Sequence, residues 1–475
     1  MLLIWVDIAD EPPRNGTIQP MIFRKSIFFA LALALVSPGA GRTALADVFG
    51  AREAVLDNGL RIVVVENSRA PVVTHMVWYR AGAMDEPPGR SGIAHFLEHL
   101  MFKGTDTRAA GEFSDIVARN GGQENAFTSQ DYTAYYQSVA SDRLELVMSL
   151  EADRMANLNI DPAHFEPERS VVLEERSQRT DSDPSSILWE QTGAALYRNH
   201  PYGIPIIGWR HEIEELRVED AIEFYDRYYA PNNAILVVSG DTTLEEVVGL
   251  AETYYGPIPA ADLPERPVWR EPPMPASTVV TYRDPRVQQP TLAIQRLAPS
   301  WGTHATDTDR IYALQVLSEI LGGGSTSLLY RGLVVDQAVA VSAGSWYSGS
   351  VRGPGSFGFY VSPRGGVDLD VAEDSLRTAV DRILSDGITE DEVTRAITRL
   401  QDAAVTALDS LSGPANQIGR ALTVGIPLSE IEAWPDRIGA VTVDQVNDAL
   451  RDVLAGEGEV VGRLLTAQDQ GADEG

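Results

Sequence analysis

The chain has 475 residues, of which 44% are hydrophobic and 22% charged, so it is globular and long enough for two packed domains, which excludes a fibrous or disordered protein. Its 68 acidic residues against 38 lysines and arginines give a net charge of -30, which argues against nucleic-acid binding because a phosphate backbone would be repelled. With no cysteine, any metal must be held by carboxylates and the seven histidines.

The first 46 residues predict a secretory signal peptide. A cationic start precedes an apolar run at 27–36, and the small-residue triplet 44–46 follows it. This run is too short to span a bilayer, and no later segment is long and apolar enough to do so. We therefore expect export to the periplasm, a mature chain that begins at Asp47, and no stable membrane insertion. Because acidic residues at the beginning do not suit a signal peptide, Met21 is an alternative start.

Runs rich in valine and aromatic residues predict strands, and amphipathic runs predict helices. In the first half we expect strands at 61–66, 72–79 and 234–239, helices at 91–103, 111–120, 142–157 and 162–179, and a further helix that ends near Tyr229. A proline-rich stretch without a periodic pattern then predicts a linker. The expected division is an N-terminal catalytic domain at 47–256, the linker at 257–277, a C-terminal domain at 278–466 and a disordered tail at 467–475.

The two halves have a related order of elements. A helix that begins at Val218 leads into the strand 235–238, and 225 residues later a helix that begins at Val443 leads into a strand at 460–464. A repeat of this length indicates a duplicated α+β domain rather than a solenoid of short units. We expect each domain to have its own core.

A short helix is expected between Ser91, which can cap its start, and Gly104, which ends it. Its apolar residues recur every three or four positions and form one face. His95, Glu98 and His99 lie on the opposite face. Imidazoles at positions i and i+4 can bind one metal ion, and the neighbouring glutamate can hold the water that the metal polarises.

Two histidine ligands require a third protein ligand, which in a chain without cysteine is expected to be a carboxylate. The helix at 162–179 offers Glu168, Glu174 and Glu175. Glu168 and Glu175 share one helix face, whereas Glu174 points about a quarter turn away. The spacing does not choose among them.

These residues resemble the pitrilysin-type inverzincin metallopeptidases of family M16, especially the bacterial and mitochondrial-processing-peptidase-like members that have two homologous halves. The similar segments cover nearly the whole chain after the signal peptide, and they are 57–60, 95–99, 121–122, 125–128, 131–133, 168–175, 200–203, 229–234 and the glycine run 322–324. The resemblance implies a mainly antiparallel sheet with packed helices in each domain. It also implies a clam-shell in which the two domains face each other around a chamber.

The resemblance assigns roles that spacing left open. It implies a Zn²⁺ ion held by His95, His99 and Glu175, with Glu98 as the general base and Glu168 as an accessory catalytic carboxylate.

It further implies that Asn125 and Ala126 lie on an edge strand that binds an extended substrate by main-chain pairing. We therefore predict a zinc-dependent endopeptidase that hydrolyses peptides or unfolded polypeptide segments in the periplasm. The alternative is a non-catalytic scaffold or assembly subunit of a peptidase-like complex.

The second half lacks the metal motif, because residues 316–320 carry no histidine where the first half has His95 and His99. Members of the family commonly bear an arginine after the glycine run and a tyrosine seven residues later, where this chain has Val334 and Val341. This difference predicts the metal-bearing subunit of a pair, in which a homologous partner subunit supplies the arginine and tyrosine. Arg331 and Tyr347 of this chain are the alternatives.

Overall fold

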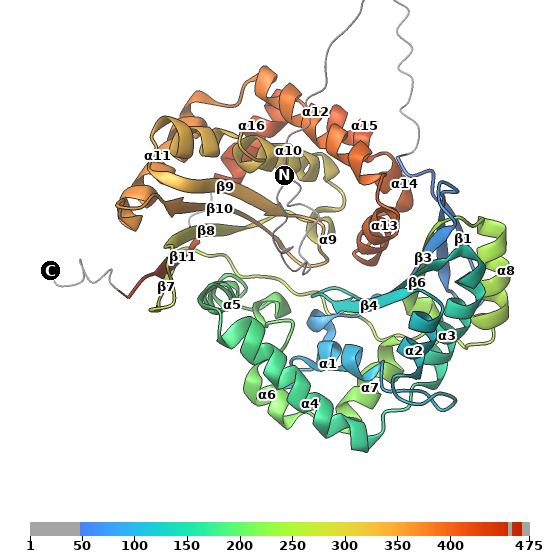
Figure 1. The fold of residues 1–475 in the computed structure, drawn as a ribbon. Coiled ribbons are helices and arrows are strands. Elements are labelled where there is room, and N and C mark those ends of the chain that lie inside the picture. The colour runs from blue at the N-terminus through green and yellow to red at the C-terminus, as the bar shows by residue number, and fades with distance from the viewer. Residues whose placement is uncertain (1–47, 455–457, 468–475) are drawn as a thin grey trace, which may run out of the picture.

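The computed structural model describes residues 48–454 and 458–467 and shows two β-sheets with helices packed on them (Figure 1). The predicted signal peptide and all but the first residue of the predicted tail lie outside these residues. The mixed arrangement of two sheets and many helices is the α+β fold that the sequence predicts. Within the described ranges, no helix combines the length and apolar character needed to cross a membrane.

The first sheet has six strands in the order β1-β2-β6-β3-β5-β4. Their bounds are β1 (Arg52–Val55), β2 (Arg61–Glu66), β3 (Val72–Tyr79), β4 (Gln123–Thr128), β5 (Thr133–Ala140) and β6 (Ala234–Gly240). Neighbouring strands are antiparallel except β2 and β6, which are parallel. Strand β4 lies at one end of this order, so one side of its main chain has no strand partner in the described structure.

The first half contains eight α-helices in the described structure. They are α1 (Ile93–Leu100), α2 (Glu112–Arg119), α3 (Leu144–Asn157), α4 (Pro162–Arg176), α5 (Pro184–Leu196), α6 (Arg210–Glu215), α7 (Val218–Tyr228) and α8 (Leu244–Tyr254). The sequence predicts both ends of β2 and β3, and helix ends within three residues. The largest differences occur at α1 and α4, since a helical pattern does not show where a turn of another kind begins; a π-helical turn, Ser177–Asp181, follows α4.

The second sheet repeats the first. Its order is β7-β11-β8-β10-β9, and β7 and β11 form its parallel pair, as β2 and β6 do in the first sheet. The strands are β7 (Thr278–Arg283), β8 (Thr291–Ala298), β9 (Ala340–Ser348), β10 (Gly355–Pro363) and β11 (Val460–Leu465). The duplication predicted from the sequence is therefore confirmed. Between α8 and β7 the chain forms no helix or strand, and the domain boundaries drawn there stay a prediction.

The helices of the second half cover its sheet and reach the first one. They are α9 (Trp301–His304), α10 (Thr308–Gly322), α11 (Leu369–Asp386), α12 (Glu390–Ala407), α13 (Gly413–Thr423), α14 (Leu428–Glu432), α15 (Trp434–Gly439) and α16 (Val443–Leu454). Helix α13 packs on β3 and β6 of the first sheet, whereas α5 of the first half packs on β7 and β11 of the second (Figure 1). Each half therefore contributes a helix that packs on the sheet of the other half.

The expectation that each domain has its own core holds for the first half but not for the second, because the first sheet is apolar on both faces and its second face joins the core of the second half. Ile62 and Val64 face a core formed by the first half, whereas Val63 and Val65 belong to the core cluster of the second half. Successive side chains of a strand point to opposite faces, so a run of valines needs cover on both. Helix α13 supplies the second cover, and a Cβ at its Gly419 would lie 2.1 Å from the indole of Trp78.

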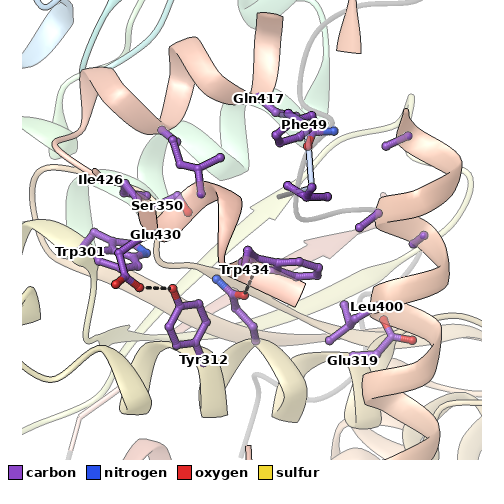
Figure 2. A pocket seen from close by; sticks show the side chains of 17 residues that line it. Phe49, Trp301, Tyr312, Glu319, Ser350, Leu400, Gln417, Ile426, Glu430 and Trp434 are labelled. Carbon is purple, nitrogen blue, oxygen red and sulfur yellow. Dashed lines mark hydrogen bonds between the residues drawn. The ribbon is translucent and has the colours of Figure 1, made fainter. Parts of the chain in front are cut away.

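The N-terminal segment also crosses to the second half, where it borders a cavity of about 90 Å³ (Figure 2). Phe49 lines this cavity together with Trp301 and Trp434. The carboxylate of Glu432 accepts hydrogen bonds from the backbone N–H groups of Phe49 at 2.7 Å and Ala51 at 2.8 Å. The cavity is lined by none of the predicted site residues.

Candidate active site

Helix α1 carries the histidine pair, and the partly buried Glu86 rather than Ser91 caps its start. The helix follows Gly92, whose φ of 88° few other residues adopt. The carboxylate of Glu86 accepts hydrogen bonds from the N–H groups of Gly92 at 3.0 Å and Ala94 at 2.9 Å. Ser91 instead accepts a hydrogen bond from the N–H of Trp209 at 2.9 Å. The expected serine cap is wrong because the left-handed turn at Gly92 directs Ser91 away from the helix.

The apolar face of α1 sets the position of the helix against α4. The residues that the sequence predicts for one apolar face are all buried, namely Ile93, Phe96, Leu97, Leu100 and Met101. The ring of Phe96 packs against that of Phe165 on α4, with centroids 4.7 Å apart. Burial of such a pair fixes the two helices side by side. The polar faces of α1 and α4 therefore meet beside this contact.

The structure brings together two imidazoles of α1 and one carboxylate of α4. The Oε2 atom of Glu175 lies 3.7 Å from Nε2 of His95 and 3.2 Å from Nε2 of His99. The three candidate ligand atoms lie within 4.8 Å of one another, and no other such triplet occurs in the described part of the chain. Zinc bonds of roughly 2.0 to 2.2 Å would fit among them. Two histidines and a carboxylate are also the donor set of catalytic zinc sites.

The other two glutamates of α4 take different places. An oxygen of Glu168 lies 2.9 Å from Nδ1 of His99, and its second oxygen lies 2.6 Å from Nζ of Lys103. Glu168 therefore holds the far side of the His99 ring and does not face the three ligand atoms. Glu174 is exposed and accepts a hydrogen bond from Gln178 at 2.8 Å. The geometry thus chooses among three carboxylates where the spacing alone did not.

Without metal, the site holds a positive charge at His99. Burial lowers the pKa of His99, but its hydrogen bonds with Glu168 and Glu175 outweigh burial and raise the pKa to about 9. The hydrogen bond from His99 lowers the pKa of Glu175 to about 2 against the effect of burial. Burial and the neighbouring His99 lower the pKa of His95 to about 4. The carboxylates are therefore arranged around a cation before any metal binds.

This charge state predicts how metal affinity depends on pH. Zinc binds neutral imidazole, so below pH 9 its binding must displace a proton from His99, whereas His95 is already neutral. We expect the affinity for zinc to fall about tenfold for each pH unit between pH 8 and pH 6, because one proton is exchanged. Competition with a chromophoric chelator at pH 6, 7 and 8 measures this slope. An affinity that is constant over this range would contradict the proton exchange at His99.

Glu98 lies beside the three ligand residues and bonds to the edge strand. Its Oε2 accepts a hydrogen bond of 2.6 Å from the hydroxyl of Thr128, the last residue of β4. Burial raises the pKa of Glu98 to about 7, although the Thr128 hydrogen bond acts in the opposite direction. A carboxylate with such a pKa can both take up and release a proton near neutral pH. Thr128 was not predicted as a site residue, although it lies three residues after Asn125.

Asn125 and Ala126 lie in β4, on the edge of the first sheet. Asn125 is exposed, and its side chain accepts a hydrogen bond of 2.9 Å from the N–H of Ala126. Strand β4 also contacts α1. The structure thus places the predicted substrate strand next to the helix that carries the histidines.

The second half holds an ion pair at its counterpart of the metal motif. Glu319 of α10, which aligns with Glu98, lies 2.7 Å from Nε of Arg399 on α12. Val334 is partly buried against the core of this half, and Val341 is 47% exposed on β9.

Tyr347 and Arg331, the two alternative substrate-binding residues, differ in whether their polar groups are free to bind a substrate. The Tyr347 side chain is buried, and its hydroxyl donates a hydrogen bond of 2.6 Å to the carbonyl of Pro299. Arg331 is exposed and lines a cavity. Of the two alternatives, Tyr347 is therefore wrong, because its hydroxyl is already used inside the fold.

Two family models match the two halves of the chain. Residues 61–209 match a family model described as insulinase, peptidase family M16, and residues 215–400 match one described as the peptidase M16 inactive domain. The zinc protease PqqE of Helicobacter pylori is 32% identical over 80% of this chain and 85% of its own.

Solved structures have the same fold. The crystal structure of a protease from Helicobacter pylori is 28% identical, with a TM-score of 0.80 over 87% of this chain and 99% of that one. The periplasmic protease PqqL from Escherichia coli shares the fold at 19% identity, with a TM-score of 0.75 over 89% of this chain and 48% of that one. The matched family models and the sequence identity with PqqE show that the chain belongs to peptidase family M16.

Proposed function

We propose that the chain is a zinc-dependent endopeptidase that cleaves peptides or unfolded polypeptide segments. The observation that carries this proposal is the cluster of His95, His99 and Glu175, with Glu98 beside it and engaged through only one of its oxygens in the described contacts. When bound there, Zn²⁺ supplies Lewis-acid polarisation of the scissile carbonyl and a lowered pKa for water. The similarity to proteins named zinc proteases supports the choice of zinc.

The residues of the chain perform the proton transfers and hold the ligands in place. Glu98 takes the proton of the attacking water and returns it to the leaving amine, which needs a pKa near neutrality. Thr128 fixes one oxygen of Glu98 and leaves the other for the water. Glu168 orients His99 through Nδ1 and leaves Nε2 for the metal. Arg179, 2.8 Å from Oε1 of Glu175, likewise leaves Oε2 for the metal.

The substrate binds as an added strand on β4. Its main chain pairs with the free edge, and a substrate carbonyl replaces the Asn125 side chain on the N–H of Ala126. Main-chain pairing requires an extended segment, so unfolded polypeptides are accepted and folded proteins are rejected.

The chain acts after export and together with a homologous subunit. The signal peptide predicted at 1–46 supports a periplasmic location. The partner is supported by Val334 and Val341, which have no side-chain group that can hydrogen-bond a substrate. The fold comparison adds that PqqL is about twice as long as the part that matches this chain. A second unit of this fold in trans would complete an assembly that PqqL holds in one chain.

Hydrolysis of an unfolded polypeptide by the purified mature chain tests the proposal. We expect internal cleavage, identified by mass spectrometry, that stops with a zinc chelator and returns when zinc is added. The same assay is repeated with a homologous M16 subunit encoded in the same genome. No cleavage under either condition would contradict the proposal and favour the scaffold alternative.

A further inference from the structure

An arginine of the second half reaches into the first half and binds two of its aspartates. Arg352 lies in the connection between β9 and β10, and its guanidinium contacts both carboxylate oxygens of Asp85 at 2.9 and 3.1 Å. Its backbone N–H donates to Asp131 at 3.2 Å, and its Nη1 donates to the carbonyl of Asp131 at 3.3 Å. The side chains of Arg352 and Asp85 are 12% and 4% exposed. A bidentate pair this well buried defines a single geometry.

The second of these aspartates, Asp131, lies in the turn that follows the substrate strand β4. Asp131 belongs to the four residues, 129–132, that connect β4 to β5. Tyr202 donates a hydrogen bond of 2.5 Å to Asp131 and accepts one of 2.8 Å from the N–H of Gly353. On the other side, the N–H of Ala83 donates to the carbonyl of Ser129 at 3.0 Å. The turn is thus clamped between the first half and residues 352–353 of the second.

The clamped turn is next to the group that holds the general base. Thr128 immediately precedes it and donates the 2.6 Å hydrogen bond to Glu98. A displacement of the turn would move Thr128 and, with it, the oxygen of Glu98 and the substrate strand. Displacements of about 1 Å can cost roughly a hundredfold in rate.

We propose that Arg352 is a positioning residue for catalysis, through which the half without a metal motif holds the β4–β5 turn and Thr128 in the geometry that Glu98 needs. This inference rests on the proposed endopeptidase function. It gives the second half a part in the reaction although it lacks the histidine pair.

Loss of Arg352 is expected to leave the chain folded. Nη1 of Arg266 lies 3.2 Å from Asp85, so the aspartate keeps a cationic partner when Arg352 is replaced. The matched control is Arg463, which pairs with Glu373 at 2.9 Å inside the second half. Arg352→Gln and Arg463→Gln therefore each remove one arginine from an ion-pair network, and only the first touches the β4–β5 turn.

Kinetics of the zinc-loaded chain, assayed with its partner where needed, give the first test. We expect Arg352→Gln to lower kcat at least about tenfold with an unchanged zinc content, and Arg463→Gln to leave kcat within about twofold of the wild type. If Arg352 acts through Thr128, the losses of kcat caused by Arg352→Gln and by Thr128→Val are not additive. Arg352→Gln then lowers kcat little further in a chain that already carries Thr128→Val. Additive losses, or equal losses from both arginine variants, would overturn the proposal.

Hydrogen exchange of the metal-free chain gives a test that does not depend on activity. We expect Arg352→Gln to raise the exchange rate of the amides at 125–132 about tenfold or more and to leave β2 unchanged. Unchanged exchange in that turn would overturn the proposed clamp. An inactive wild type with the expected exchange would refute the endopeptidase instead, and an active wild type with unchanged exchange would refute only the role of Arg352.

Discussion

Glu98→Gln is expected to retain about one zinc per chain and to lose roughly 10²- to 10⁴-fold in hydrolysis, the usual contribution of a general base. The three ligand atoms belong to His95, His99 and Glu175, so the substitution leaves the metal set intact. A glutamine oxygen can still accept the hydrogen bond from Thr128. What disappears is the group that accepts the proton of water. Peptide hydrolysis and metal analysis on the same sample measure both effects.

Two further glutamine variants serve as controls for this prediction. Glu174→Gln changes an exposed glutamate of the same helix that bonds only Gln178 in the described contacts, so we expect normal zinc content and normal activity. Glu175→Gln removes a proposed ligand and is expected to lower both. Full activity in Glu98→Gln would refute the mechanism, and normal zinc content in Glu175→Gln would shift the third ligand to Glu168.

The sequence predicts those elements whose pattern is set by local contacts. Strands β2 and β3 are found at the residues expected, because runs of valine are poor helix formers and bury both faces of a strand. The same pattern does not show what covers the second face. The packing of α13 on the first sheet depends on Gly419 meeting Trp78, which are more than three hundred residues apart. That contact, and hence the shared core, follows only from the folded chain.

The candidate site, like the fold, could be predicted from the sequence only in part. The separation of His95 and His99 on one helix indicates a metal site without further information, because the helical repeat alone brings their rings together. The cap of α1 was not predictable from this motif, since Glu86 reaches Gly92 from a preceding turn. Spacing also did not separate Glu168 from Glu175, because both lie on the face of α4 that meets α1. Only the distances to Nδ1 and Nε2 of His99 distinguish a ligand from the residue that orients it.

The isolated chain is expected to be a weak peptidase that a homologous subunit activates roughly 10²- to 10³-fold, the usual effect of one donor at the reacting carbonyl. Val334 is packed against its own core, and Val341 is exposed on β9 without a polar group. The hydroxyl of Tyr347 is bound to Pro299, so it cannot replace the missing tyrosine. A partner with arginine and tyrosine at the equivalent positions would supply both donors.

Three assays under identical conditions decide this prediction: the chain alone, the chain with its partner, and the chain with a partner whose arginine and tyrosine are replaced by alanine and phenylalanine. If the partner supplies donors, the altered partner still binds but activates little. If it only encloses the substrate, both partners activate equally, and the idea of a divided site is wrong. A chain that is as fast alone as in the mixture would leave Arg331 as its own substrate-positioning residue, which Arg331→Ala would then test. Its exposed side chain makes that substitution compatible with folding.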